Sequence, residues 1–154
     1  MSTAEGLRPI QTIREGNLVW AADPDTGEVR LQPVVKTMKH MVSSLRLLNV
    51  GGETIRTTDI HPFWVEQRGW TRAEHLTAGD TLRSKDGSRL ALLASRLVST
   101  NGATASSESG FIKASTSNLK PLSQLEGAFP VYNLEVGGFH TFFVSKAQIL
   151  VHNK

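Results

Sequence analysis

The chain has 154 residues, with 17 Lys and Arg against 14 Asp and Glu, and a formal net charge of +3 at pH 7. This length suits one domain with a sizeable core, and the weak, unclustered charge gives no support to nucleic-acid binding. The lack of cysteine excludes disulfides and thiolate metal ligands, and no signal-peptide pattern or membrane-spanning apolar run is seen.

Strand patterns dominate the chain, and three of them are predicted to form hairpins because turn residues separate apolar segments. The first hairpin joins Leu18–Trp20 to the segment from Val29 through a loop at Asp23–Gly27. The second is indicated by Val34–Val50, which ends at a turn at Gly51-Gly52. The third joins Thr81-Leu82 to Leu90–Leu93 through a turn at Lys85–Gly87. No helical pattern exceeds about two turns. The best helical candidates are Pro9–Glu15 and Arg72–Thr77.

The two helical candidates belong to an internal repeat. Five positions recur 63 residues later: Gly6, Ile13, Gly16, Asn17 and Val19 match Gly69, Leu76, Gly79, Asp80 and Leu82. The shared pattern is a short helical turn, a glycine reversal and a strand. Two glycines at one spacing indicate two related supersecondary units.

Ser99–Asn118 differs from the rest of the chain, since small and polar residues fill it and only Phe111 and Ile112 are bulky and apolar. Such a segment buries too little surface to offset an ordering entropy of roughly 1–2 kcal/mol per residue. We expect a mobile insertion there.

The segment Val131–Lys154 encloses His140 between two apolar runs and ends on His152, Asn153 and Lys154. An asparagine amide can attack its own backbone carbonyl, close a succinimide and release whatever follows. The tethered nucleophile gains an effective molarity of about 10⁵ M or more, and an imidazole can protonate the departing amine. The alternative is a frayed polar end without chemistry.

A second candidate site is Thr58-Asp59-Ile60-His61, which precedes the apolar Phe63-Trp64-Val65. Pro62 biases His61 toward an extended backbone. The hydroxyl and the imidazole could polarise a peptide bond and move its proton. The alternative is a surface histidine held by a local threonine, and alternation along a strand would direct Asp59 into solvent.

In this order, the motifs resemble the Hint superfamily, which comprises inteins, the hedgehog autoprocessing domain and Hint domains ahead of toxin modules in bacterial polymorphic toxins. The matching segments are Gly6–Glu28, Thr57–Leu82 and Val131–Asn153. The segments HPFWV (His61–Val65) and RGW (Arg68–Trp70) look most like the toxin-associated branch. The resemblance implies one all-β domain over residues 1–154, a Hint/intein-like horseshoe of twisted antiparallel strands with pseudo-two-fold internal duplication.

By this resemblance, Thr58 and His61 fall on the pair that assists the N-terminal acyl shift of protein splicing. His140 falls on the histidine that assists asparagine cyclisation, and His152 and Asn153 fall on the terminal His-Asn. The implied function is autoproteolytic release of a downstream C-terminal toxin module, with Asn153 as nucleophile and no cofactor. The domain would be a single-turnover autoprotease at most.

Three positions depart from the family pattern. We expect the first strand and its Cys or Ser nucleophile to lie before Met1, because Ser2 is in the wrong register. Asn133 replaces an aspartate, and Lys154 replaces the Cys, Ser or Thr that splicing needs as acceptor. The N-terminal half of the reaction is therefore expected to be disabled. The alternative function is a non-catalytic β scaffold that presents a C-terminal toxin module.

The resemblance also implies a covalently linked C-terminal toxin or effector module as partner, and secretion or surface display within a larger exported bacterial protein. We expect a monomer without a membrane span. A zinc site from His61, His140 and His152 is an alternative, although no short-spaced ligand pair occurs. Trp20, Trp64 and Trp70 are interpreted as core anchors.

Overall fold

The computed structural model describes residues 1–99 and 129–153, and this part of the chain is built from antiparallel strands and two short 3-10 turns. The strands are β1 (Ser2–Thr3), β2 (Gly6–Leu7), β3 (Leu18–Ala22), β4 (Val29–Val42), β5 (Ser44–Val50), β6 (Glu53–Thr57), β7 (Pro62–Val65), β8 (Gly69–Arg72), β9 (Thr81–Arg83), β10 (Arg89–Ser99), β11 (Phe129–Val136), β12 (Thr141–Val144) and β13 (Ile149–His152). The turns are η1 (Ile10–Thr12) and η2 (Ala73–His75). No helix in the described ranges is long and apolar enough to cross a membrane.

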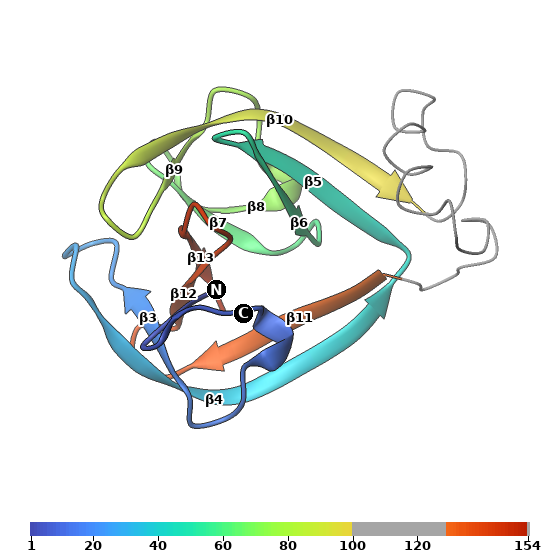
Figure 1. Cartoon of the computed structure of the whole chain (residues 1–154). Coiled ribbons are helices and arrows are strands. Elements are labelled where there is room, and N and C mark those ends of the chain that lie inside the picture. The colour runs from blue at the N-terminus through green and yellow to red at the C-terminus, as the bar shows by residue number, and fades with distance from the viewer. Residues whose placement is uncertain (100–128, 154) are drawn as a thin grey trace.

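The strands form two curled sheets, with the orders β11-β4-β3-β1-β2 and β12-β13-β7-β9-β10-β5-β6, and β8 pairs with β7. Figure 1 shows the long strands β4 and β10 curving around opposite sides of the molecule, with β12 and β13 between the two arms. The predicted horseshoe of twisted antiparallel strands is therefore confirmed. Of the predicted insertion, Ser99 ends β10, and residues 100–118 lie outside the described residues.

The three predicted hairpins are present, as β3–β4, β5–β6 and β9–β10. The β5–β6 hairpin turns at Gly51 and Gly52, whose φ angles are 58° and 79°. Two consecutive positive φ angles define the tight turn that matches the twist of paired strands, and glycine adopts them without steric cost. The Gly-Gly pair thus fixes where β5 reverses.

The internal repeat is visible in matching hydrogen bonds. The turns η1 and η2 lie 63 residues apart, as the sequence pattern predicted. The Gly16 amide donates to Val34 and the Gly79 amide donates to Leu92, each at 2.8 Å. The side chain directly after each glycine closes the loop: the Asn17 Oδ1 accepts from the Arg14 amide at 2.9 Å, and the Asp80 Oδ2 accepts from the Thr77 amide at 2.8 Å. The same local unit therefore occurs twice.

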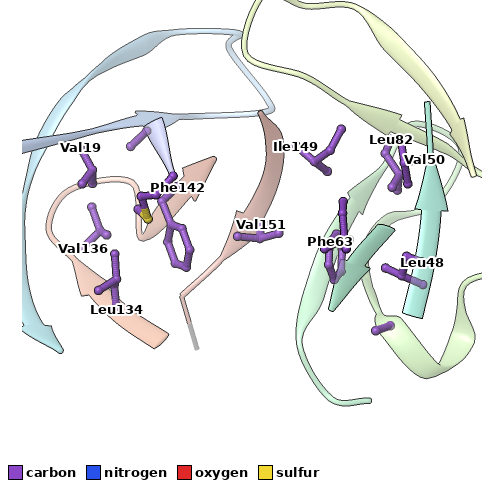
Figure 2. Close-up of a cluster of buried hydrophobic side chains, with 14 of the residues drawn as sticks. Val19, Leu48, Val50, Phe63, Leu82, Leu134, Val136, Phe142, Ile149 and Val151 are labelled. Atoms are coloured by element: carbon purple, nitrogen blue, oxygen red, sulfur yellow. The ribbon is translucent and has the colours of Figure 1, made fainter. Parts of the chain in front are cut away.

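One continuous apolar core joins the two sheets. Figure 2 shows Phe142, Ile149 and Val151 of the β12–β13 hairpin between side chains of the two halves. On one side lie Val19, Leu134 and Val136, and on the other lie Leu48, Val50, Phe63 and Leu82. The last hairpin is therefore held from both sides, which fixes the place where β13 ends.

Candidate functional site

The topology brings four of the predicted site residues to one end of β13, namely His61, His140, His152 and Asn153. Because β13 runs antiparallel to both β12 and β7, its last residue lies near the first residues of these strands. His140 directly precedes β12, and His61 directly precedes β7. Val151 pairs with Phe63, so continuing this register by two residues aligns Asn153 with His61. Asn153 therefore follows β13 between two histidines that are distant in sequence.

Asn153 is held by its backbone and its side chain, and it is only 7% exposed. Its backbone N–H donates to the His140 carbonyl at 2.9 Å, and its Nδ2 donates to the Val136 carbonyl at 3.3 Å. Its Oδ1 is buried and has no hydrogen-bond partner among the described residues. A buried amide oxygen without a partner carries a free-energy cost of about 1–3 kcal/mol, and such groups in native proteins call for a physical explanation.

His140 adopts a left-handed backbone conformation with φ of 58°, after a loop that contains Gly137 and Gly138. A non-glycine residue in this region is uncommon and directs attention to the site. The ring of His140 is exposed, whereas its carbonyl binds the Asn153 amide. The described contact between His140 and Asn153 is thus made through the main chain.

The glycine loop before His140 leads to a stability prediction. Gly138 has a φ of 69°, and an added Cβ would lie 2.5 Å from the Gln32 Oε1. We expect Gly138→Ala to lower the free energy of unfolding by about 1–2 kcal/mol, through backbone strain and displacement of Gln32. Urea unfolding at pH 7 measures this. The matched control is Gly137→Ala, whose Cβ would meet Pro33 at 3.5 Å and needs no positive φ; equal losses in both variants would contradict the strain argument.

The Thr58–His61 segment is a tight turn rather than a strand. The His61 amide donates to the Thr58 carbonyl at 3.4 Å, and the His61 carbonyl accepts from the Ala73 amide at 3.0 Å. Asp59, which strand alternation was expected to direct into solvent, instead pairs with the Arg46 Nε at 2.6 Å. That expectation was wrong because residues in a turn do not alternate. The turn is thus fixed to both η2 and β5.

Thr58 and His61 line an apolar cleft of about 870 Å³. The cleft runs between β6 and the start of β11, and Phe63, Phe142 and Val151 contribute to its walls. His140, His152 and Asn153 are not among its lining residues. The predicted residues therefore surround one end of β13 from two sides. Thr58 and His61 also line the cleft, whereas His140, His152 and Asn153 do not, and Val151 belongs to both the cleft wall and β13.

The imidazole of His61 packs against two aromatic rings, those of Phe63 at 5.8 Å and Phe142 at 6.2 Å between centroids. Burial lowers the pKa of His61 from 6.5 to about 4, and the charge of nearby His152 lowers it as well. Burial disfavours the charged imidazolium because the apolar surroundings cannot replace its hydration. His61 is therefore neutral at pH 7, and burial makes it a weaker base than an exposed histidine.

The lowered pKa of His61 predicts a pH-dependent stability. Between pH 6.5 and 4 the unfolded state binds a proton on His61 that the folded state does not bind, so the stability present above pH 6.5 is lost as pH falls toward 4. After discounting for partial solvent exposure, we expect a loss of about 2 kcal/mol between pH 7 and pH 4.5. Urea unfolding at both pH values measures it. His61→Gln should remove this part of the pH dependence and the exposed His75→Gln should retain it; identical profiles would contradict the assignment.

His152 lies on the other face of the sheet from His61. Its ring packs edge-to-face on Trp70, with centroids 5.0 Å apart, whereas His61 contacts Phe142 of the main core. Successive residues of a strand point to opposite faces, so His152 shares a face with Leu150 and the side chain of Val151 points into the main core. In the described ranges, no three His, Asp or Glu side chains gather closely enough to hold a metal ion.

The sequence reasoning missed several neighbours of the site. The Val136 carbonyl, the Trp70 ring and the Phe142 ring contact Asn153, His152 and His61, respectively. The tryptophan was interpreted only as a core anchor, and it does pack on the small core cluster around Phe143. No sequence pattern marks a backbone carbonyl as a contact of the site.

Comparisons with known proteins identify the family and the fold of this chain. The family model for the pretoxin HINT domain matches residues 1–105. A solution structure of a bacterial intein-like domain from Clostridium thermocellum is 33% identical, with coverage of 99% of this chain and 93% of that chain and a TM-score of 0.78.

More distant structures share the fold. A DnaB intein from Synechocystis is 20% identical, with coverage of 100% of this chain and 93% of that chain and a TM-score of 0.70. The gp41-1 intein is also 20% identical, with coverage of 99% and 91% and a TM-score of 0.67. A search of curated proteins gave no match. With the family model covering more than half of its length and a 33% identical intein-like relative covering nearly all of it, the chain belongs to the pretoxin Hint family.

Proposed function

We propose that this domain cleaves the peptide bond after Asn153 by asparagine cyclisation and so releases a C-terminal toxin module. The observation that carries the proposal is the fixed position of Asn153, which is buried at the end of β13 and bonded to both His140 and Val136. A preorganised nucleophile lowers the entropic part of the barrier, and well-oriented intramolecular reactions gain about 7–11 kcal/mol in this way.

Asparagine cyclisation needs only groups of this chain. The Asn153 Nδ2 attacks the main-chain carbonyl carbon of Asn153, and the C–N bond to residue 154 breaks. Nδ2 loses one proton, and the departing amine gains one. The Val136 carbonyl accepts from Nδ2 at 3.3 Å, which supports the step because an acceptor on that N–H increases the electron density on the nitrogen.

In the proposed mechanism, three histidines assist cleavage of the bond after Asn153. His140 and His152 flank Asn153 and would carry the proton to the leaving amine. Burial lowers the pKa of His61 to about 4, so its ring stays neutral at pH 7 and would serve as a hydrogen-bond acceptor that orients a reacting group. Together with Thr58, it would form the site of the acyl-shift half of the reaction.

Membership of the pretoxin family supports a linked C-terminal toxin as the partner. It also supports export within a larger bacterial protein. A non-catalytic scaffold is the second candidate function. The exposed ring of His140, which contacts Asn153 through the main chain, favours that candidate because a proton donor needs its imidazole near the reacting nitrogen.

A fusion with a folded partner after Lys154 tests the proposal. On prolonged incubation near neutral pH, we expect two fragments in the mass spectrum: a domain that ends in a succinimide or its hydrolysis product at Asn153, and a partner that begins at Lys154. A fusion that stays intact would leave the scaffold as the function of this domain.

A further inference from the structure

The aromatic face behind β13 carries an inference that rests on the proposed function. His152, beside the proposed scissile bond, contacts Trp70, which belongs to β8. β8 pairs only with β7 within the described sheets, so it is an edge strand added to the outside of the site. An edge strand contributes little to the main core, and its tryptophan nevertheless reaches the end of β13.

Trp70 is itself held from behind by a continuous stack of side chains. Trp64 lies directly across from Trp70 in the β7–β8 pairing, and their rings meet edge-to-face at 5.3 Å. The guanidinium of Arg83 lies 5.6 Å from the Trp64 ring centroid, and Glu66 binds that guanidinium through both carboxylate oxygens at 2.6 and 2.9 Å. A bidentate pair has a fixed geometry, so it limits the movement of the rings packed on it.

The opposite-face arrangement explains why His152 needs such a support. Its neighbours in sequence, Val151 and Asn153, are anchored on the core side, by the apolar core and by the Val136 carbonyl, respectively. The imidazole of His152 projects away from that core, onto the face that carries Trp70. The Trp70 ring therefore restricts the side-chain rotamers that His152 can adopt on this face.

From these contacts we infer that Trp70 is a positioning residue, which holds the His152 imidazole in the orientation needed for proton transfer after Asn153. Aromatic edge-to-face contacts are selective for ring orientation, unlike contacts with an aliphatic side chain. The stacked side chains from Glu66 to Trp70 therefore hold the Trp70 ring in place against the β7–β9 region, and the Trp70 ring in turn restricts the His152 ring at the end of β13.

The test combines cleavage rates with a spectroscopic readout. In the fusion after Lys154, we expect Trp70→Leu to slow release about 3- to 10-fold, the effect of losing one aromatic pair, and Trp70→Phe to restore most of the rate. In NMR spectra, the His152 ring protons, identified by their loss in His152→Gln, should shift in Trp70→Leu because the indole ring current is gone.

The matched control is Trp20→Leu. Trp20 packs on the same small core cluster as Trp70, and the ring contact of His152 is made with Trp70. The control should lower stability to a similar extent while the release rate and the His152 resonances stay as in the wild type. If Trp20→Leu and Trp70→Leu slow release to the same extent, Trp70 acts only through general packing and the inference is wrong.

The two readouts separate this inference from the proposed function. If the wild-type fusion stays intact, the proposed function fails, and the His152 resonances alone decide whether Trp70 orients the ring. If the wild type is cleaved but Trp70→Leu has the same rate and the same His152 resonances, the inference about Trp70 is wrong and the proposed function stands.

Discussion

Replacement of Asn153 by alanine is expected to abolish release of a partner fused after Lys154. The amide of Asn153 is the only nucleophile that can form a five-membered ring at that bond, and alanine leaves no group that can cyclise. The domain should stay folded, because the lost side-chain hydrogen bond to the Val136 carbonyl contributes only about 1 kcal/mol. Mass spectrometry after prolonged incubation, with circular dichroism as a check of folding, measures the outcome.

The matched control is Asn49→Ala, which removes an exposed asparagine from β5, far from the end of β13 in sequence and paired with Thr54 of β6. This variant should release the partner at the wild-type rate. If Asn153→Ala releases the partner as fast as wild type and Asn49→Ala, then the bond is broken by another group or by a contaminating protease.

Removal of the His140 imidazole is expected to slow release by roughly 10²–10⁴-fold, the usual contribution of a general acid or base. His140 has a φ of 58°, so alanine would add backbone strain to the loss of the imidazole. His140→Asn is the cleaner variant, because asparagine tolerates this left-handed conformation better than most residues. Its main-chain carbonyl would still accept from the Asn153 amide, so the end of β13 should keep its place.

The rate constants of wild type, His140→Asn and His140→Ala, measured from pH 6 to 8, would separate the two contributions. Equal slowing in both variants identifies the imidazole as the active group. A wild-type rate in His140→Asn would show that the backbone contact alone matters. The exposed His75→Asn serves as control for the general effect of losing a histidine.

Local patterns in the sequence were sufficient for the three hairpins and the repeat, whereas the horseshoe was expected from the resemblance to the Hint superfamily. The three hairpins follow from turn residues between apolar segments, and the Gly51-Gly52 turn needs only the freedom of glycine at positive φ. The repeat is a local signal too, because Asn17 and Asp80 each bond an amide three residues earlier in their own loop. Such interactions span few residues, so the order of residue types determines them.

The chemistry of the candidate site was only partly accessible from the sequence. The motif residues Thr58, His61, His140, His152 and Asn153 were named from their order along the chain. The surroundings of these residues could not be predicted, because strand pairing between β7 and β13 joins segments that lie far apart in the sequence. The lowered pKa of His61 depends on burial beside Phe142, which no local pattern encodes.

The sequence by itself therefore determined the three hairpins and the repeat, and it supplied the candidate site residues, since these depend on local backbone preferences and residue chemistry. Only the tertiary structure decided that His61 and His152 lie on opposite faces of one sheet, that Trp70 packs against His152, and that Asp59 pairs with Arg46. The physical reason is that a strand's neighbours, and the face that each side chain shares, are set by register across the sheet rather than by position along the chain.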